Sequence, residues 1–164
     1  AGQGTVGMEI LRQRPGDDLD AIFLPIGGGG LAAGVAAYVK TLYPDVRIYG
    51  VEPRDAACMQ AAIAHGGPVR LARVGAFADG AAVREAGHET HRLLAQYLDG
   101  IVLVDTDEIC AAIQDGFEDT RVLLEPAGAL ALAGLKRHVA EHGPFARAAV
   151  AVLSGANMNF DRLR

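Results

Sequence analysis

Apolar positions follow two alternating patterns along this chain. Short, largely apolar runs, which suit strands covered on both faces, occur at residues 22–24, 47–51, 101–104 and 149–153. Apolar residues at helical spacing lie before, between and after them, at residues 3–12, 31–42, 55–63, 88–98, 105–117 and 127–142. Strands that alternate with helices predict an α/β fold whose mostly parallel sheet has helices on both faces.

Boundary residues support these elements. The run Asp105-Thr106-Asp107-Glu108 combines a side-chain cap with acidic residues in the first turn, which predicts a helix start. Apolar residues in the stretch 69–86 show neither the helical nor the strand spacing. Within it, residues 77–82 have mostly small side chains and include a glycine, which predicts a loop held close to a site.

The glycine run Gly27–Gly30 follows the first predicted strand and leads directly into a helix. Four consecutive glycines are costly in backbone entropy, and they let a ligand approach the main chain without meeting a Cβ. At a helix start the N–H groups of such a loop converge, which favours binding of an anion such as phosphate. A plain turn or a flexible linker is the alternative, although apolar elements on both sides argue against a linker.

Three glycine-rich or polar features lie at one predicted edge of the sheet. Gly27–Gly30 follows the first strand, Glu52 the second and Ser154 the fourth. Ligands of parallel sheets bind beyond the carboxyl ends of the strands. We therefore expect a binding site at this edge.

Composition narrows the class of protein. At 164 residues, with 51% hydrophobic and 21% charged residues, the chain suits a globular, soluble domain. A net charge of −5 without any Lys/Arg cluster argues against nucleic-acid binding, and no apolar run is long enough to span a membrane. Two cysteines fit a reducing compartment, which predicts a cytoplasmic protein.

Four motifs, in this order, resemble those of the tryptophan-synthase-β-like enzymes of fold type II, which use pyridoxal phosphate. The resemblance covers essentially the whole chain, and within the superfamily it is strongest to the biosynthetic L-threonine dehydratase group, which the segment Phe77-Ala78-Asp79-Gly80 also fits. The motifs are Pro25-Ile26-Gly27-Gly28-Gly29-Gly30-Leu31, Val51-Glu52-Pro53, Glu125-Pro126-Ala127-Gly128-Ala129 and Leu153-Ser154-Gly155-Ala156-Asn157.

The resemblance implies a pyridoxal-phosphate site. It places the phosphate on backbone N–H groups and the pyridine nitrogen beside the Ser154 hydroxyl, a neutral partner that makes the ring a weaker electron sink than a carboxylate would. Gly80 and Glu125 are expected near the ring or substrate, with a plain turn and a helix-start carboxylate as equal alternatives. The implied cofactor-binding residues are Gly27, Gly28, Gly29, Gly30, Leu31, Gly80, Glu125, Ser154 and Asn157.

The implied reaction is the conversion of L-threonine, or of L-serine as an alternative substrate, to a 2-oxo acid and ammonia. For threonine this is 2-oxobutanoate, a step of isoleucine biosynthesis. The reaction requires a Schiff-base lysine, yet the only lysines, Lys40 and Lys136, have the pattern of exposed helix residues. We therefore expect no catalytic residue in this chain. We interpret residues 1–164 as part of a catalytic domain, truncated at both ends, without the lysine region or a C-terminal regulatory domain, and inactive alone.

A cation site is a further implication of the resemblance, at Glu52 and the carbonyl of Ala56. The family's third ligand, an aspartate, is replaced by Cys58, and a thiol is a poor ligand for Mg²⁺. A monovalent cation and a purely structural Glu52 remain alternatives.

Two other functions stay open. One is a serine or threonine dehydratase or a serine racemase of the same superfamily. The other is a non-catalytic module that binds a phosphorylated ligand or assembles with another chain. The resemblance also implies a homo-oligomer for the full-length protein.

Overall fold

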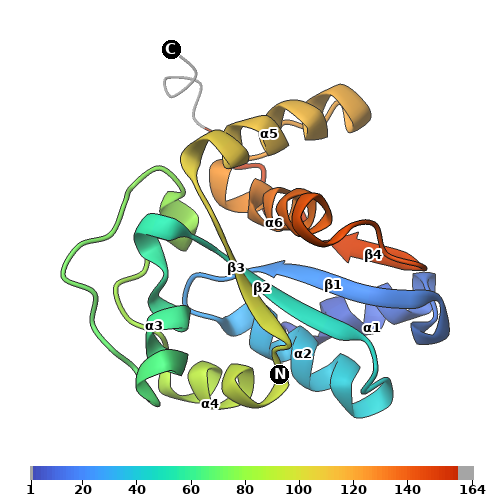
Figure 1. Ribbon diagram of the computed structural model, residues 1–164, viewed down its shortest axis with the longest axis horizontal. Helices are drawn as coiled ribbons and strands as arrows, with labels where there is room; N and C mark the ends of the chain where they lie inside the picture. The colour runs from blue at the N-terminus through green and yellow to red at the C-terminus, as the bar shows by residue number, and fades with distance from the viewer. Residues whose placement is uncertain (1, 159–164) are drawn as a thin grey trace.

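A single parallel sheet forms the centre of the computed structural model, which describes residues 2–158 (Figure 1). Its strand order is β3-β2-β1-β4, and every neighbouring pair is parallel. The predicted α/β class and the order of the elements are confirmed. The strands are β1 (Leu19–Pro25), β2 (Arg47–Pro53), β3 (Gly100–Val104) and β4 (Ala148–Ala151).

Helices cover both faces of this sheet (Figure 1). Four lie on one face, namely α1 (Gly4–Gln13), α2 (Gly30–Leu42), α3 (Cys58–His65) and α4 (His88–Tyr97). The other face carries α5 (Thr106–Thr120) and α6 (Pro126–His142). Short 3₁₀ turns, η1 (Gly16–Asp18), η2 (Arg54–Ala56) and η3 (Asp79–Ala81), lie in the connections. No helix among residues 2–158 combines the length and the apolar character needed to cross a bilayer.

The central strand β1 separates two apolar clusters. Ile22 and Leu24 belong to the cluster beneath α2 and α4, whereas Ala21 and Phe23 belong to the cluster beneath α6. All four side chains are fully buried. This alternation follows from the period of two along a strand, and it fixes which face of β1 meets each helical layer.

A charged pair joins β1 to the chain just before β4. Asp20 is only 8% exposed, and its two carboxylate oxygens accept hydrogen bonds from Arg147 N at 2.7 Å and Arg147 Nε at 2.8 Å. The backbone bond from Arg147, followed by the bond from its side chain, lowers the pKa of Asp20. The pair therefore holds the start of β4 beside β1, where the register shifts between Leu19 and Ala21.

Several predicted boundaries were wrong: β1 begins at Leu19 rather than at residue 22, β2 runs on through Glu52 to Pro53, and two others lie near the predicted site. The helix expected from Asp55 begins at Cys58, because η2 intervenes and the Glu52 carboxylate accepts hydrogen bonds from the first turn of α3. The fourth strand ends at Ala151 rather than at Leu153, since the chain then turns toward α6, where Glu125 N donates to Gly155 O at 3.2 Å.

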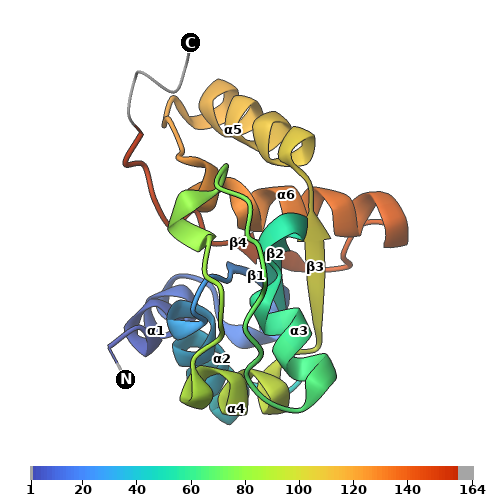
Figure 2. The ribbon, with the colours of Figure 1, turned by 90° about the vertical axis from the view of Figure 1, so that its left-hand side faces the viewer.

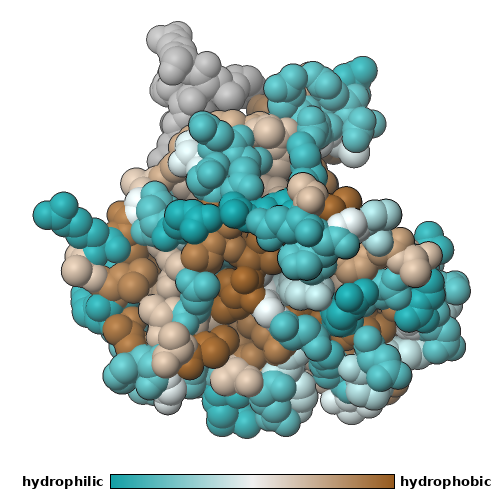
Figure 3. Space-filling view, viewed as in Figure 1, coloured by the Kyte–Doolittle hydropathy of each residue, from teal (hydrophilic) through white to brown (hydrophobic). Residues whose placement is uncertain are grey.

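The outer edge of β3 has no strand partner among residues 2–158. Residues 101–103 of this strand are only partly buried. Figure 3 shows apolar side chains gathered near the middle of the face that carries β3.

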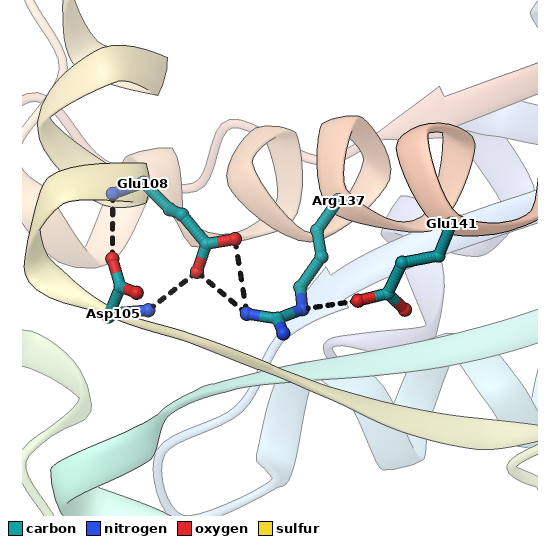
Figure 4. Close-up of polar contacts among 4 residues, drawn as sticks. All are labelled: Asp105, Glu108, Arg137 and Glu141. Atoms are coloured by element: carbon teal, nitrogen blue, oxygen red, sulfur yellow. Dashed lines mark hydrogen bonds and ion pairs between the residues drawn. The ribbon is translucent and has the colours of Figure 1, made fainter.

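A network of four charged residues joins α5 to α6 (Figure 4). Asp105 caps α5 by accepting from Glu108 N at 3.0 Å, and Glu108 Oε2 accepts from Asp105 N at 2.8 Å. Arg137 Nη1 donates to both Glu108 oxygens, and Arg137 Nε donates to Glu141 Oε1 at 2.9 Å. The predicted cap of α5 is therefore confirmed as a reciprocal capping box.

Removing this cap should destabilise the fold. We expect Asp105→Ala to lower the free energy of unfolding by about 1 kcal/mol, because the N–H group of Glu108, in the first turn of α5, loses its side-chain acceptor. Asp107→Ala, in the same first turn but outside the capping box, is the matched control and should cost less than about 0.5 kcal/mol. Urea denaturation measures both. Equal losses in the two variants would show that the capping box contributes nothing specific.

Candidate functional site

The glycine loop connects the end of β1 to the start of α2. Gly29 precedes the helix in a left-handed conformation, with φ at 88°. The first hydrogen bond into the helix is donated by Ala33 N to Gly29 O, at 2.8 Å. The hydrogen bonds formed within residues 2–158 use none of the N–H groups of Gly27, Gly28 and Gly29, and those of Gly30 and Leu31 precede the first helical bond. The loop thus presents a group of donors that have no acceptor within the described part of the chain.

The four glycines have different surroundings. A Cβ on Gly29 would lie 2.7 Å from Met59 Cε and 3.0 Å from Thr90 Cβ, so this position is packed from behind. Around Gly28 and Gly30 a Cβ would meet no atom within 4 Å. The loop therefore has one packed side and one open side.

Close glycine contacts bring four of the predicted segments together. A Cβ on Gly27 would lie 3.4 Å from Gly80 O, and one on Gly80 would lie 3.7 Å from Glu125 Oε1. A Cβ on Gly155 would overlap the Glu125 carboxylate. The glycine loop, η3, the start of α6 and the segment after β4 thus form one continuous edge. Figure 2 shows the chain between α3 and α4 crossing in front of the carboxyl ends of the strands.

Ser154 and Asn157 lie on the exposed segment that follows β4. This segment is held at the site by Val152 N, which donates to Phe23 O at 3.1 Å, and by the bond from Glu125 N to Gly155 O. The structure therefore brings Ser154 to the predicted edge. The contacts of Ser154 and Asn157 with a cofactor remain predictions.

Glu52, near the carboxyl end of β2, is fully buried. Its two carboxylate oxygens accept hydrogen bonds from Met59 N and Gln60 N, both at 2.8 Å. Burial raises the pKa of Glu52 to about 7 against the opposing effect of these two bonds. Both oxygens serve the start of α3, which supports the structural alternative for this residue.

No group of three His, Cys, Asp or Glu side chains suited to a metal ion occurs among residues 2–158. Ala56 is buried at the end of η2, just before α3, which begins at Cys58. The cation site at Glu52 and Ala56 thus remains a prediction.

Neither lysine belongs to the glycine-loop edge. Lys40 is in the last turn of α2, where its Nζ lies 2.7 Å from Asp99 Oδ2, and its side chain is only 13% exposed. The expectation of an exposed Lys40 was therefore wrong, because Asp99 and the carbonyl of Pro44 hold the ammonium against the protein. Lys136 is exposed on α6 and pairs with Asp115.

Sequence reasoning missed the side chains that hold the loop from behind. Thr90 Oγ1 donates to Gly28 O at 2.6 Å, and Cys58 Sγ donates to Gly27 O at 3.4 Å. The sequence predicted a helix at residues 88–98, but no local pattern links Thr90 to a loop 62 residues away.

Comparisons with known proteins agree with this geometry. The sequence profile of a family described as "Pyridoxal-phosphate dependent enzyme" matches residues 1–155. The chain is 58% identical over 164 residues to a protein of Burkholderia multivorans named L-threonine dehydratase biosynthetic IlvA, covering all of this chain and 32% of that protein. The chain thus spans about a third of the length of this curated relative. Relatives from Arabidopsis thaliana and Schizosaccharomyces pombe are named chloroplastic and mitochondrial.

Solved structures share the fold. A processed form of threonine deaminase isoform 2 from Solanum lycopersicum is 44% identical with a TM-score of 0.95, and the match covers 99% of this chain and 47% of that one. A maize serine racemase is 33% identical with a TM-score of 0.87, covering 99% of this chain and 51% of the other. The fold type expected from the sequence is confirmed.

The buried Glu52 carboxyl should make stability depend on pH. Its pKa rises from 4.5 to about 7 on folding, so the folded state binds this proton more tightly than the unfolded chain does. The resulting stabilisation is fully present below pH 4.5 and is lost as the pH rises through 7, by at most about 3 kcal/mol.

Urea denaturation of the wild type and of Glu52→Gln between pH 4.5 and 8 measures this contribution. The unfolding free energy of the wild type should fall steadily relative to that of Glu52→Gln as the pH rises. Glu9→Gln, on the exposed side of α1, is the control for an unrelated glutamate. A difference between wild type and Glu52→Gln that stays constant across this range would contradict the raised pKa.

Proposed function

This chain belongs to the family of pyridoxal-phosphate dependent enzymes, and we propose that it is the cofactor-holding part of an L-threonine dehydratase. The single observation that carries the proposal is the open row of main-chain donors at Gly27–Gly30, set beside Ser154 at the same sheet edge. The substrate and the biosynthetic role come from the names of relatives such as the one from Burkholderia multivorans.

The glycine loop suits a phosphate dianion. Hydrogen bonds to a charged group contribute roughly 1.5–3 kcal/mol each, so several converging N–H groups can hold a cofactor by its phosphate. The start of α2 adds the positive end of the helix dipole. Leu31, in the first turn, supplies one more donor of this kind.

The positions of Gly28 and Gly30 support the same ligand. Folding does not require glycine at either residue, because a Cβ there would meet open space and neither φ is in the left-handed region. An alanine at Gly30, within α2, would favour the helix by about 0.5–1 kcal/mol. Glycine at these positions keeps the space in front of the donors clear, as the approach of a phosphate requires.

The remaining residues of the edge have separate proposed roles. Pyridoxal phosphate, when bound, supplies an electron sink for reactions at the α-carbon of an amino acid. The Ser154 hydroxyl would partner its pyridine nitrogen, with Asn157 supporting the serine segment. Gly80 and Glu125 would lie beside the ring or the substrate. Lys40 and Lys136 are placed elsewhere, so we propose that this chain binds and orients the cofactor but supplies no amine for proton transfer.

The proposed overall reaction converts L-threonine to 2-oxobutanoate and ammonia. A serine or threonine dehydratase or a serine racemase is the second candidate, favoured by the likeness to the maize serine racemase. A homo-oligomer, a monovalent cation near Glu52 and a cytoplasmic location are further expectations from the sequence, and they remain predictions.

Blocking the open side of the loop tests the phosphate site. We expect Gly28→Ala to weaken binding of inorganic phosphate and of pyridoxal phosphate by roughly tenfold to a hundredfold, because the new methyl group displaces the ligand from one or two N–H donors. The unfolding free energy should change by less than about 0.5 kcal/mol, since the methyl group meets no protein atom.

Isothermal titration calorimetry measures the affinity, and urea denaturation measures the stability. Gly67→Ala is the matched control, because a Cβ there also meets open space but lies outside the proposed site. Failure of both phosphate and pyridoxal phosphate to bind the wild-type chain would refute the proposed function. Equal binding by Gly28→Ala would place the phosphate elsewhere.

A second prediction concerns the missing amine. Pyridoxal phosphate bound to this chain should be removed by dialysis after borohydride treatment, because neither lysine is at the glycine-loop edge. Peptide mass spectrometry after reduction tests for an adduct. A stoichiometric, site-specific adduct on Lys40 or Lys136 would contradict the division between binding and chemistry proposed above.

A further inference from the structure

Two carbonyl groups of the glycine loop are held from the packed side. Thr90, on α4, donates to Gly28 O at 2.6 Å, and Cys58, at the start of α3, donates to Gly27 O at 3.4 Å. Both helices lie on the same face of the sheet as α2 (Figure 1). The two side chains thus reach the loop from behind, opposite the open space next to Gly28.

Peptide geometry links these carbonyls to the donors of the site. The C=O of one residue and the N–H of the next share a plane, and in a trans peptide they point in opposite directions. Residues 2–158 contain no cis peptide. Holding Gly28 O toward Thr90 therefore directs the N–H of Gly29 away from α4. Holding Gly27 O toward Cys58 directs the N–H of Gly28 away from α3.

Packing prevents the loop from rotating out of this arrangement. At Gly29, Met59, Thr90 and Leu94 occupy the space in which a side chain would lie. The left-handed φ of 88° at Gly29 further restricts the two adjoining peptide planes. Thr90 thus donates its hydroxyl to Gly28 O, and its Cβ is one of the atoms that leave no room for a side chain at Gly29.

We propose that Thr90, with a smaller contribution from Cys58, is a positioning residue that aims the N–H groups of Gly29 and Gly28 at the phosphate. Neither side chain touches the ligand; each acts through a carbonyl of the loop. This inference rests on the proposed function, since it assigns the direction of donors in the same site.

The chemistry of the two donor groups indicates which residue should affect phosphate binding more. The single Thr90 hydroxyl proton has two carbonyl acceptors, Gly28 O at 2.6 Å and Gly87 O at 3.0 Å, and the shorter contact is to the loop. Cys58 Sγ donates to Gly27 O over the longer distance of 3.4 Å. Because S–H is a weak donor, Thr90 should have the larger effect.

The test compares variants that remove or keep the donor in the full chain. Thr90→Val replaces the hydroxyl by a methyl group of similar size, and Thr90→Ser keeps the hydroxyl. Thr41→Val is the matched control, because Thr41 Oγ1 also donates to a carbonyl, Ala37 O at 2.7 Å, but far along α2 from the loop. Cys58→Ala and Cys58→Ser form the corresponding pair at the second residue.

Two measurements decide the outcome, namely the dissociation constant for inorganic phosphate and the ¹H–¹⁵N amide signals of Gly28 and Gly29. For Thr90→Val we expect the dissociation constant to rise roughly threefold to tenfold and the Gly29 signal to move in the free chain. For Thr90→Ser and Thr41→Val the constant should stay within about twofold of the wild type. Cys58→Ala should move the Gly28 signal and weaken phosphate binding less than Thr90→Val does. Cys58→Ser should return both the Gly28 signal and the dissociation constant toward the wild-type values.

The results separate this inference from the proposed function. If the wild type binds phosphate and Thr90→Val binds it equally well, the positioning role is overturned while the phosphate site stands. A Thr90→Ser variant as weak as Thr90→Val would also overturn it, because the hydroxyl would then not be the group responsible. If the wild type binds neither phosphate nor pyridoxal phosphate, the proposed function is wrong and this inference falls with it.

Discussion

The burial of β1 on both faces is the constraint on which the rest of the structure depends. Phe23 and Ile22 point into opposite apolar clusters, so the strand can neither shift by one residue nor tilt without exposing one set of side chains. The charged Asp20 is tolerated in this strand because Arg147 satisfies both of its carboxylate oxygens. The end of β1 is therefore fixed in space, and the glycine loop starts from a rigid point.

The site itself is assembled by close backbone approach at several glycines. Gly27 meets η3, Gly80 meets the start of α6, and Gly155 meets Glu125, each at a separation that a side chain would prevent. Glycine leaves room for the main chain of η3 at Gly27 and for the side chains of Ala127 and Glu125 at Gly80 and Gly155. Segments separated by more than a hundred residues of sequence thus share one edge.

Much of this arrangement could be predicted from the sequence, because it depends on the spacing of apolar residues and on the glycines at the ends of the elements. Alternating apolar patterns gave the order of strands and helices, and the glycine run next to a buried strand indicated an anion site. Long-range contacts carry no such signal. Glu52 accepts N–H groups seven and eight residues further on, and Thr90 bonds a carbonyl 62 residues away, so neither role follows from local spacing. A family resemblance suggested a cation at Glu52, which remains a prediction, and the structure adds that both Glu52 oxygens accept N–H groups from the start of α3.

The way the loop is built separates binding from chemistry. Its donors are main-chain N–H groups, which do not titrate, and the Gly28 carbonyl behind them accepts from the Thr90 hydroxyl, which does not titrate either. In the scheme that the resemblance implies, a lysine holds the cofactor and takes the α-proton, and Lys40, at the end of α2, is instead engaged by Asp99. The proposed function therefore assigns phosphate binding and proton transfer to different residues. A change at Thr90 should weaken the first without creating or removing the second.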